Sequence, residues 1–238
     1  VPVELSEDSI KKTWDALCQA KHPRLQVCAA VSSVQMEYIH HKKPDAMIAA
    51  IADTVSKCCA VCADVEFVAD DATRSDMAFL AQAIRTAVEA GAKTVTVCDA
   101  AGTMLPEEFA EFIKQLYESI PELQNVVLGV SCTDTLSMAD ACAIAAVSRG
   151  AGEIKAAAYP IKNVSLANVA RILSAKGSAF RCTCPVQVTQ LSRVIDQITW
   201  MCQAGSSKRS PFGTGSREET GIFLTAHDDV SAVAKVVE

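Results

Sequence analysis

Short apolar runs alternate along the chain with longer amphipathic stretches. The apolar runs are typical of strands, because they are brief, partly β-branched and bounded by polar or turn-forming residues. We predict strands near Leu25–Val31, Asp64–Ala69, Thr94–Asp99, Val126–Val130, Glu153–Tyr159 and Ser210–Thr214. The stretches between them repeat apolar positions every three or four residues, as helices do. The pattern therefore predicts strand–helix–strand units and a parallel sheet.

Several helix ends are marked by residues that favour them. Ser75 can cap a helix that Gly91 closes. Pro106 suits the first turn of the next helix, where Glu107 and Glu108 would face the positive end of its dipole. The apolar stripe of that helix consists of Phe109, Phe112, Ile113 and Leu116. Further helices are predicted at Glu7–Ala20, Asp45–Cys62, Met138–Ser148, Ser165–Ala175 and Val186–Met201.

Two folds fit this alternation, an open doubly wound sheet and a (β/α) barrel. No glycine-rich dinucleotide fingerprint follows a strand. Polar residues gather instead where strands end, at Ser32, Ser33, Asp70, Asp71, Asp99, Ser131 and Thr133. Polar groups that converge from several strand ends are typical of barrels. We predict an α/β fold, namely a TIM-type (β/α) barrel that is incomplete, because only about six of its eight strands lie in this chain.

Size and composition fit a single barrel domain over residues 1–238, with residues 204–238 as a tail after the barrel. The 238 residues are 50% hydrophobic, which is enough for one large core. A net charge of −6 without a basic stripe argues against nucleic acid as a partner. No apolar run is long enough to span a membrane, and the acidic start is unlike a signal peptide. We therefore expect a cytoplasmic protein.

Eleven cysteines are many for this length, and most of them fall inside helix or strand patterns. Their number is odd, which speaks against a framework of disulfides. We interpret them as small buried apolar side chains in a reducing compartment. The alternative is a metal site on Cys58, Cys59 and Cys62 or on the RCTC sequence, although a second ligand pair at zinc-like spacing is missing.

Two stretches of the sequence resemble a known enzyme family. They are DVEFVADDATRSD at residues 64–76 and AGAKTVTVCDAAGTMLPEEF at residues 90–109. Both are similar to the catalytic barrel of 2-isopropylmalate synthase and homocitrate synthase, in the HMGL-like or DRE-TIM metallolyase group. Similarity at residues 21–38, 150–159 and 217–224 extends the resemblance over nearly the whole chain.

The resemblance implies a condensation of acetyl-CoA with a 2-oxo acid. A divalent metal (Mg, Mn or Zn) at the strand carboxyl ends would hold the oxo acid, and a base would take a proton from the acetyl methyl group. The family's metal ligands are an Asp of the first strand and a His-x-His pair of the sixth. That pair falls on Ser131 and Thr133, so both imidazoles are missing. We therefore expect no bound metal or other cofactor.

Other positions of the family pattern have also changed. Gln26 stands where the resemblance implies a substrate-binding His, the late motif at residues 218–223 lacks both of its histidines, and the first two strand units have no counterpart. The resemblance leaves Glu66 and Asp99 as relics of the catalytic site. It leaves Gln26, Glu66, Arg74 and Asn163 as candidate substrate-binding residues.

Each of these residues also has a purely structural interpretation. Glu66 could pair with Arg74 or a lysine, because a buried carboxylate needs a partner. Asp99 could bond the amides of its own turn, and Asn163 could cap the helix that follows it. Ser131 and Thr133 could be ordinary residues at the end of a strand. Both interpretations remain open from the sequence.

Three functions fit this sequence. The chain is a catalytically inactive relative of the synthases that acts as a partner or sensing subunit, an active acyl-CoA-dependent condensing enzyme with altered or borrowed ligands, or a fragment of a longer protein. For the first, we expect a homo-oligomer or a hetero-oligomer with a complete synthase, in which the partner covers the strand near Leu25–Val31. A 2-oxo acid or related carboxylate is the expected ligand.

Overall fold

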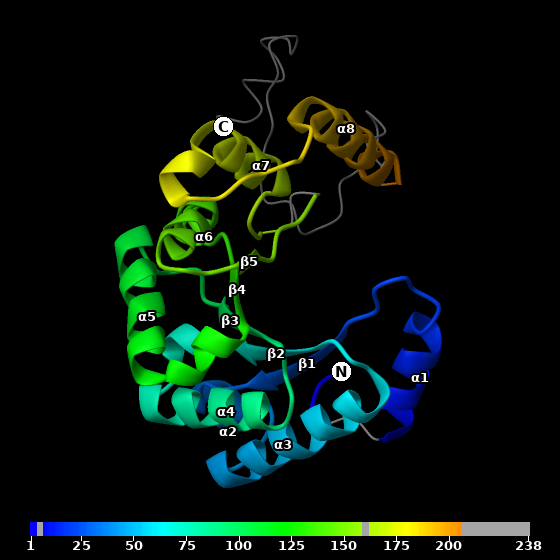
Figure 1. The fold of residues 1–238 in the computed structure, drawn as a ribbon, viewed down its shortest axis with the longest axis vertical. Coiled ribbons are helices and arrows are strands. Elements are labelled where there is room, and N and C mark those ends of the chain that lie inside the picture. Colours follow the sequence, from blue (N-terminus) through cyan, green and yellow to red (C-terminus); the bar gives the residue numbers. More distant parts are fainter. Residues whose placement is uncertain (4–6, 159–161, 206–238) are drawn as a thin grey trace, which may run out of the picture. The chain divides into compact units, whose positions relative to one another are not determined.

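The computed structural model describes residues 1–3, 7–158 and 162–205. Within them, five parallel strands form one sheet in the order β1-β2-β3-β4-β5 (Figure 1). The strands are β1 (Leu25–Ala30), β2 (Val65–Asp70), β3 (Thr94–Asp99), β4 (Val127–Cys132) and β5 (Glu153–Ile154). Strand order follows chain order without the reversal of a doubly wound sheet. The predicted α/β fold, an incomplete (β/α) barrel, is therefore confirmed.

The first four strands lie close to their predicted positions, whereas the fifth is shorter than the predicted Glu153–Tyr159. The backbone leaves β4 directly after β5. Lys155 N still donates to Val130 O at 2.8 Å, but Ala157 N donates to Val164 O at 2.9 Å. The chain thus turns to pair with its own returning segment, and the strand ends. The strand predicted at Ser210–Thr214 lies outside the described residues, as does nearly all of the predicted tail.

Residues Val1–Val3 lie along the outer edge of β1. Pro2 forms a parallel bridge with Cys28. Cys28 N donates to Val1 O and Val3 N donates to Cys28 O, both at 3.1 Å. This edge of β1 is therefore not free at Cys28, where the expected partner contact near Leu25–Val31 would have needed it. A partner strand could not pair with β1 there without displacing the chain's own residues.

Eight α-helices occur in the described residues. They are α1 (Glu7–Leu17), α2 (Ser33–Tyr38), α3 (Pro44–Val61), α4 (Met77–Glu89), α5 (Pro106–Ser119), α6 (Ala139–Ser148), α7 (Leu166–Lys176) and α8 (Val188–Gly205). The chain divides into two compact units, residues 1–195 and 196–238, and the sheet belongs to the first. No helix in the described part of the chain is long and apolar enough to cross a membrane.

One face of the sheet packs against the helices and forms the core. Alternate strand residues such as Val27, Phe67, Val95, Val97 and Val130 are fully buried there. The four apolar residues predicted on α5 are buried as well. The cysteine interpretation holds for the buried Cys58, Cys62, Cys132 and Cys142, whereas Cys18 and Cys202 are exposed; all eleven thiols are free.

The N-cap of α4 differs from the prediction by one residue. Asp76, not Ser75, caps this helix, because its Oδ1 accepts a hydrogen bond from Phe79 N at 3.0 Å. Ser75 Oγ instead donates to Val31 O at 2.7 Å. Both residue types cap helices well, and a tertiary contact with the loop after β1 decides between them. Gly91 follows the helix end with a φ of +112°, as its predicted closing role requires.

Gly129 of β4 has no room for a side chain. A Cβ there would lie 2.4 Å from Thr96 Oγ1, whereas a Cβ at Gly152 would meet its nearest atom, Val127 Cγ1, at 3.3 Å. Thr96 cannot rotate away without losing its hydrogen bond to Glu66 Oε1, which is 2.6 Å long. The packing of β4 against Thr96 of β3 therefore requires a residue without a side chain at position 129.

We expect Gly129→Ala to lower the free energy of unfolding by about 1–3 kcal/mol through overpacking. Gly152→Ala is the matched control and should cost clearly less, because Val127 Cγ1 has to give way by only a few tenths of an ångström. Urea unfolding of both variants, followed by circular dichroism, measures the difference. Equal losses in the two variants would show that the contact with Thr96 is not the cause.

Candidate functional site

The sheet has an inner face, defined here as the face turned away from the core helices. Alternation along the strands places these side chains on it: Gln26, Cys28, Glu66, Val68, Asp70, Thr94, Thr96, Cys98, Ser131 and Glu153. Because all strands are parallel, this face has an amino end and a carboxyl end. In barrels of this kind, chemistry takes place at the carboxyl end.

The candidate substrate-binding residues are divided between the two ends. Gln26 and Glu66 are register partners near the start of their strands, and Glu66 pairs in turn with Thr94. Ser131 lies four residues beyond Val127, the β4 partner of Thr94, which is about 13 Å along a strand. The structure therefore does not bring Gln26 and Glu66 to the carboxyl end. A shared substrate-binding role with Arg74 and Asn163 stays a prediction.

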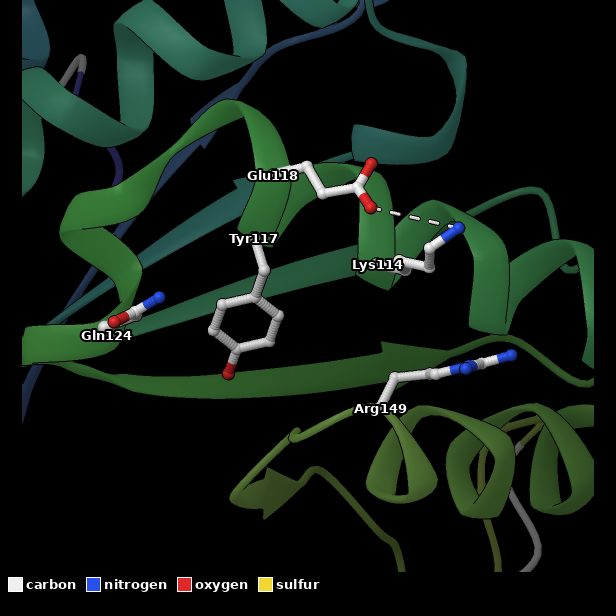
Figure 2. A pocket seen from close by; sticks show the side chains of 5 residues that line it. All are labelled: Lys114, Tyr117, Glu118, Gln124 and Arg149. Carbon is white, nitrogen blue, oxygen red and sulfur yellow. Dashed lines mark ion pairs between the residues drawn. The ribbon is translucent and has the colours of Figure 1, made fainter.

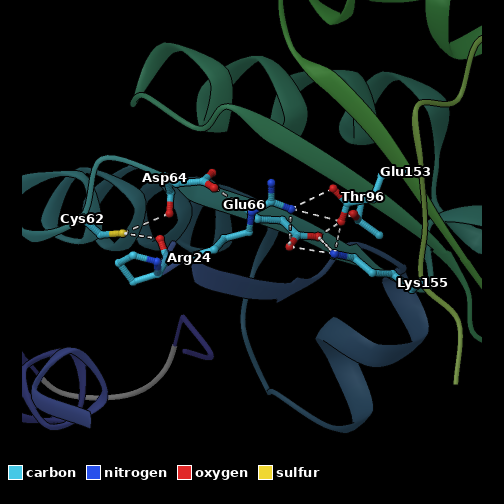
Figure 3. Close-up of polar contacts among 8 residues, drawn as sticks. Arg24, Cys62, Asp64, Glu66, Thr96, Glu153 and Lys155 are labelled. Atoms are coloured by element: carbon cyan, nitrogen blue, oxygen red, sulfur yellow. Dashed lines mark hydrogen bonds and ion pairs between the residues drawn. The ribbon is translucent and has the colours of Figure 1, made fainter. Parts of the chain in front are cut away.

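Glu66 is enclosed by partners at the amino end (Figure 3). Its carboxylate is 1% exposed. Thr96 Oγ1 donates to Oε1 at 2.6 Å, and Lys155 Nζ donates to Oε2 at 2.9 Å and lies 2.8 Å from Oε1. The structural interpretation of Glu66 is thus confirmed, with Lys155 and not Arg74 as the partner. Lys155 was not singled out from the sequence, where only its place as a charged residue inside the predicted strand Glu153–Tyr159 could have indicated it.

Arg74 is bound by Asp71, the residue directly after β2. Its Nε donates to Asp71 Oδ1 at 2.8 Å, and its Nη2 lies 2.7 Å from Asp71 Oδ2. Asp71 is fully buried and has a φ of +57°. The hydrogen bond to Asp71 is also the main reason that the pKa of Arg74 is raised. Although half of the Arg74 side chain is exposed, two of its donors are already committed to this chain.

Asp99 serves its own turn, as the structural interpretation proposed. It is 2% exposed, and its Oδ1 accepts hydrogen bonds from Thr73 Oγ1 at 2.9 Å and Gly102 N at 3.2 Å. Gly102 has a φ of +62°, and a Cβ there would lie 2.3 Å from Thr133 O. The loops after β3 and β4 therefore touch directly, backbone against backbone.

A returning segment of the chain lies against the end of β4. Thr133 forms an antiparallel bridge with Asn163, and Asp134 N donates to Lys162 O at 2.9 Å. Thr133 N is occupied as well, because it donates to Asp99 O at 3.0 Å. Asn163 itself is exposed. Its interpretation as a helix cap is wrong, since the side chain of Ser165 caps α7.

The donors at the carboxyl end do not fit the divalent metal that the resemblance implies. Ser131 and Thr133 offer neutral hydroxyls, whereas hard divalent ions take carboxylates and imidazoles. Among the described residues, no group of three or more His, Cys, Asp or Glu side chains could hold a metal ion. That search covers the cysteine cluster on α3. His22, His40 and His41 lie in segments before β1 and after α2, and His227 is outside the described residues.

A pocket of about 370 Å³ lies outside the inner face, beside α5 and the end of α6 (Figure 2). Lys114, Tyr117, Glu118, Gln124 and Arg149 line it. Lys114 Nζ is 3.0 Å from Glu111 Oε1 and 3.8 Å from Glu118 Oε1. Tyr117 Oη donates to Gly150 O at 3.0 Å. These contacts join neighbouring surface elements.

Comparison with known proteins matches the HMGL-like family model to residues 1–198. The 2-isopropylmalate synthase of Clostridium kluyveri is 27% identical over 224 residues, which are 91% of this chain and 43% of that protein. The enzyme of the same name from Rhodopirellula baltica is 30% identical over 201 residues, covering 82% of this chain and 38% of that protein. The chain thus spans less than half the length of these curated relatives.

Two solved structures share the fold. HMG-CoA lyase from Pseudomonas aeruginosa has a TM-score of 0.65 at 16% identity, covering 95% of this chain and 71% of that chain. The lyase from Brucella melitensis has a TM-score of 0.65 at 13% identity, covering 79% of this chain and 70% of that chain. At such identities the similarity concerns the fold alone.

Thiol labelling tests whether Cys98, near the carboxyl end of β3, is protected by its burial. Burial is the main cause that raises the pKa of Cys98, to about 12, although a hydrogen bond with Ser131 lowers it. At pH 8 roughly one such thiol in ten thousand is ionised. We expect iodoacetamide to label the exposed Cys18 at least about 100-fold faster than Cys98, as measured by mass spectrometry of peptides. Urea-unfolded protein is the control and should label at both residues. Comparable rates in the folded protein would show that burial does not protect the Cys98 thiol.

Proposed function

The chain belongs to the HMGL-like family, and on that premise we propose that it is a 2-isopropylmalate synthase-like barrel without condensing activity. It acts as a partner or ligand-sensing subunit and takes no divalent metal as cofactor. One observation carries the proposal. The hydroxyls of Ser131 and Thr133 stand where the resemblance implies the two imidazole ligands of the metal.

The loss of these ligands removes the centre of the family's reaction. A metal ion polarises the oxo-acid carbonyl and holds the substrate in place. Neutral hydroxyls do not replace imidazole or carboxylate in this role, because they bring neither charge nor a strong lone pair to the ion. Without the ion, the residues that the structure describes at the carboxyl end offer no replacement for its charge, which would stabilise the alkoxide that forms when a carbonyl is attacked.

The surviving polar residues support the same conclusion, because the chain uses them itself. Arg74 is bound to Asp71 through two nitrogen atoms, and Asp99 Oδ1 accepts hydrogen bonds from Thr73 Oγ1 and Gly102 N. A general base must be able to reach the proton that it abstracts. Asp99, at 2% exposure, lacks that access.

The partners follow from the same premise. The chain spans 43% of the length of the C. kluyveri relative, so more than half of that relative is not matched by this chain. We propose that the chain associates with itself or with a complete synthase, and that its ligand is a 2-oxo acid or a related small carboxylate. The competing function is an active condensing enzyme that borrows its missing residues from another chain.

A metal and activity assay separates these two functions. We expect no stoichiometric Mn²⁺ binding, measured by electron paramagnetic resonance with the full chain. We also expect no release of CoA thiol from acetyl-CoA with a panel of 2-oxo acids. The C. kluyveri synthase is the positive control. One Mn²⁺ per chain, or CoA release by this chain alone, would refute the proposal, and release only after a complete synthase variant made inactive is added would favour the competing function.

Ser131→His combined with Thr133→His tests whether the missing imidazoles are the cause. Mn²⁺ binding should rise in the double variant by at least about tenfold, as a restored ligand pair predicts, without CoA release. Thr103→His, an exposed residue between β3 and α5, is the matched control and should not change binding. No gain in the double variant would show that more than two ligands have been lost.

A further inference from the structure

We propose that five charged side chains form a latch across the inner face of the sheet. The latch holds together the first and last strands of the sheet, β1 and β5. The latch consists of Arg24, Asp64, Glu66, Glu153 and Lys155 (Figure 3). It is a conformational device of the fold and does not depend on the proposed function.

The latch joins strands that are not neighbours. Three strands separate β1 from β5, which in a flat sheet would place them about 19 Å apart. Nevertheless Arg24, directly before β1, donates from Nη1 to Glu153 Oε2 at 2.8 Å and to Oε1 at 3.1 Å. Glu153 is the first residue of β5. The contact is therefore possible only because the sheet coils strongly, as a barrel does.

The centre of the latch is the buried carboxylate of Glu66 on β2. Lys155, directly after β5, binds both of its oxygens, and Arg24 Nη1 lies 3.8 Å from Oε2. Arg24 also donates from Nε to Asp64 Oδ2 at 3.0 Å. A buried charge that loses its partner is strongly destabilising. Glu66 thus opposes any movement that takes Lys155, and with it β5, away from β2.

Glu153, Lys155 and Arg24 keep their charges because of one another. Burial by itself would raise the pKa of Glu153, but hydrogen bonds from Lys155 and Arg24 lower it below its usual value. Burial would likewise lower the pKa of Lys155, but hydrogen bonds to Glu153 and Glu66 raise it. Arg24 has its pKa raised mainly by the hydrogen bond to Glu153. All three are therefore ionised near neutral pH.

The latch matters most for β5, because the backbone holds this strand weakly. β5 has two register pairs with β4, Gly129 with Glu153 and Val130 with Ile154. By contrast, six pairs join β1 to β2. The chain continues from β5 into the segment that returns to lie against Thr133. Opening the latch should therefore loosen β5 and, with it, the cover over the end of β4.

Amide hydrogen exchange, detected by NMR on the full chain, tests this coupling. In Arg24→Gln, we expect the amides of Gly152 and Lys155, which bind Leu128 O and Val130 O, to exchange at least about tenfold faster. These amides lie some 130 residues away from the substitution. Glu153→Gln should have a similar effect, and the double variant should add little to either single one, because both break the same contact.

Lys114→Gln is the matched control, because it breaks an exposed ion pair with Glu111 outside the latch; it should change these two rates less than about twofold. The latch is refuted if Arg24→Gln accelerates exchange only near β1 and leaves Gly152 and Lys155 unchanged. Should that variant not fold, Arg24→Lys keeps the charge but loses the forked contact. It should still accelerate both amides measurably, and unchanged rates in it would refute the latch equally.

Discussion

The buried carboxylate of Glu66 is the constraint on which the inner face of this sheet depends. Glu66 is 1% exposed, and a charge buried to that extent needs partners. The partners come from next to β1 and β5, the first and last strands of the sheet. Lys155 approaches from beyond β5, and Arg24 from before β1. Gly129 leaves the space in which Thr96 completes the arrangement. The curvature of the sheet, the glycine at position 129 and the ion pairs thus act together to satisfy the buried carboxylate at the amino end of the strands.

The carboxyl end, where barrels of this family carry out their chemistry, is organised differently. Here the polar residues are bound to each other and to the backbone. Arg74 holds Asp71, Asp99 holds the turn at Gly102, and Thr133 joins the returning segment at Asn163. Contacts of this kind preserve a fold without requiring a metal or a substrate. Membership of the HMGL-like family therefore establishes the fold of this end of the sheet but not its chemistry, since fold alone does not imply function.

Prediction succeeded where local pattern decides and failed where distant segments meet. The strands β1 to β4, the start of α5 at Pro106 and the closing role of Gly91 follow from periodicity and capping chemistry, which act over a few residues. The cap of α4 was misplaced because a contact between Ser75 and Val31 competes with capping. Of the candidate site, the sequence left Asp99 open between a catalytic relic and a turn residue, and the structure shows its hydrogen bond within the turn. The division of the candidates between the amino and carboxyl ends of the sheet was not predicted.

The sequence by itself determined the α/β class, the order of the elements and the family, because each depends on residue type and spacing along the chain. Only the tertiary structure decided that Arg24 and Glu153 meet, that Lys155 neutralises Glu66, and that Val1–Val3 lie along β1. The physical reason is the coiling of the sheet. It brings together side chains separated by more than a hundred residues, and the spacing of residues along the chain does not predict such contacts.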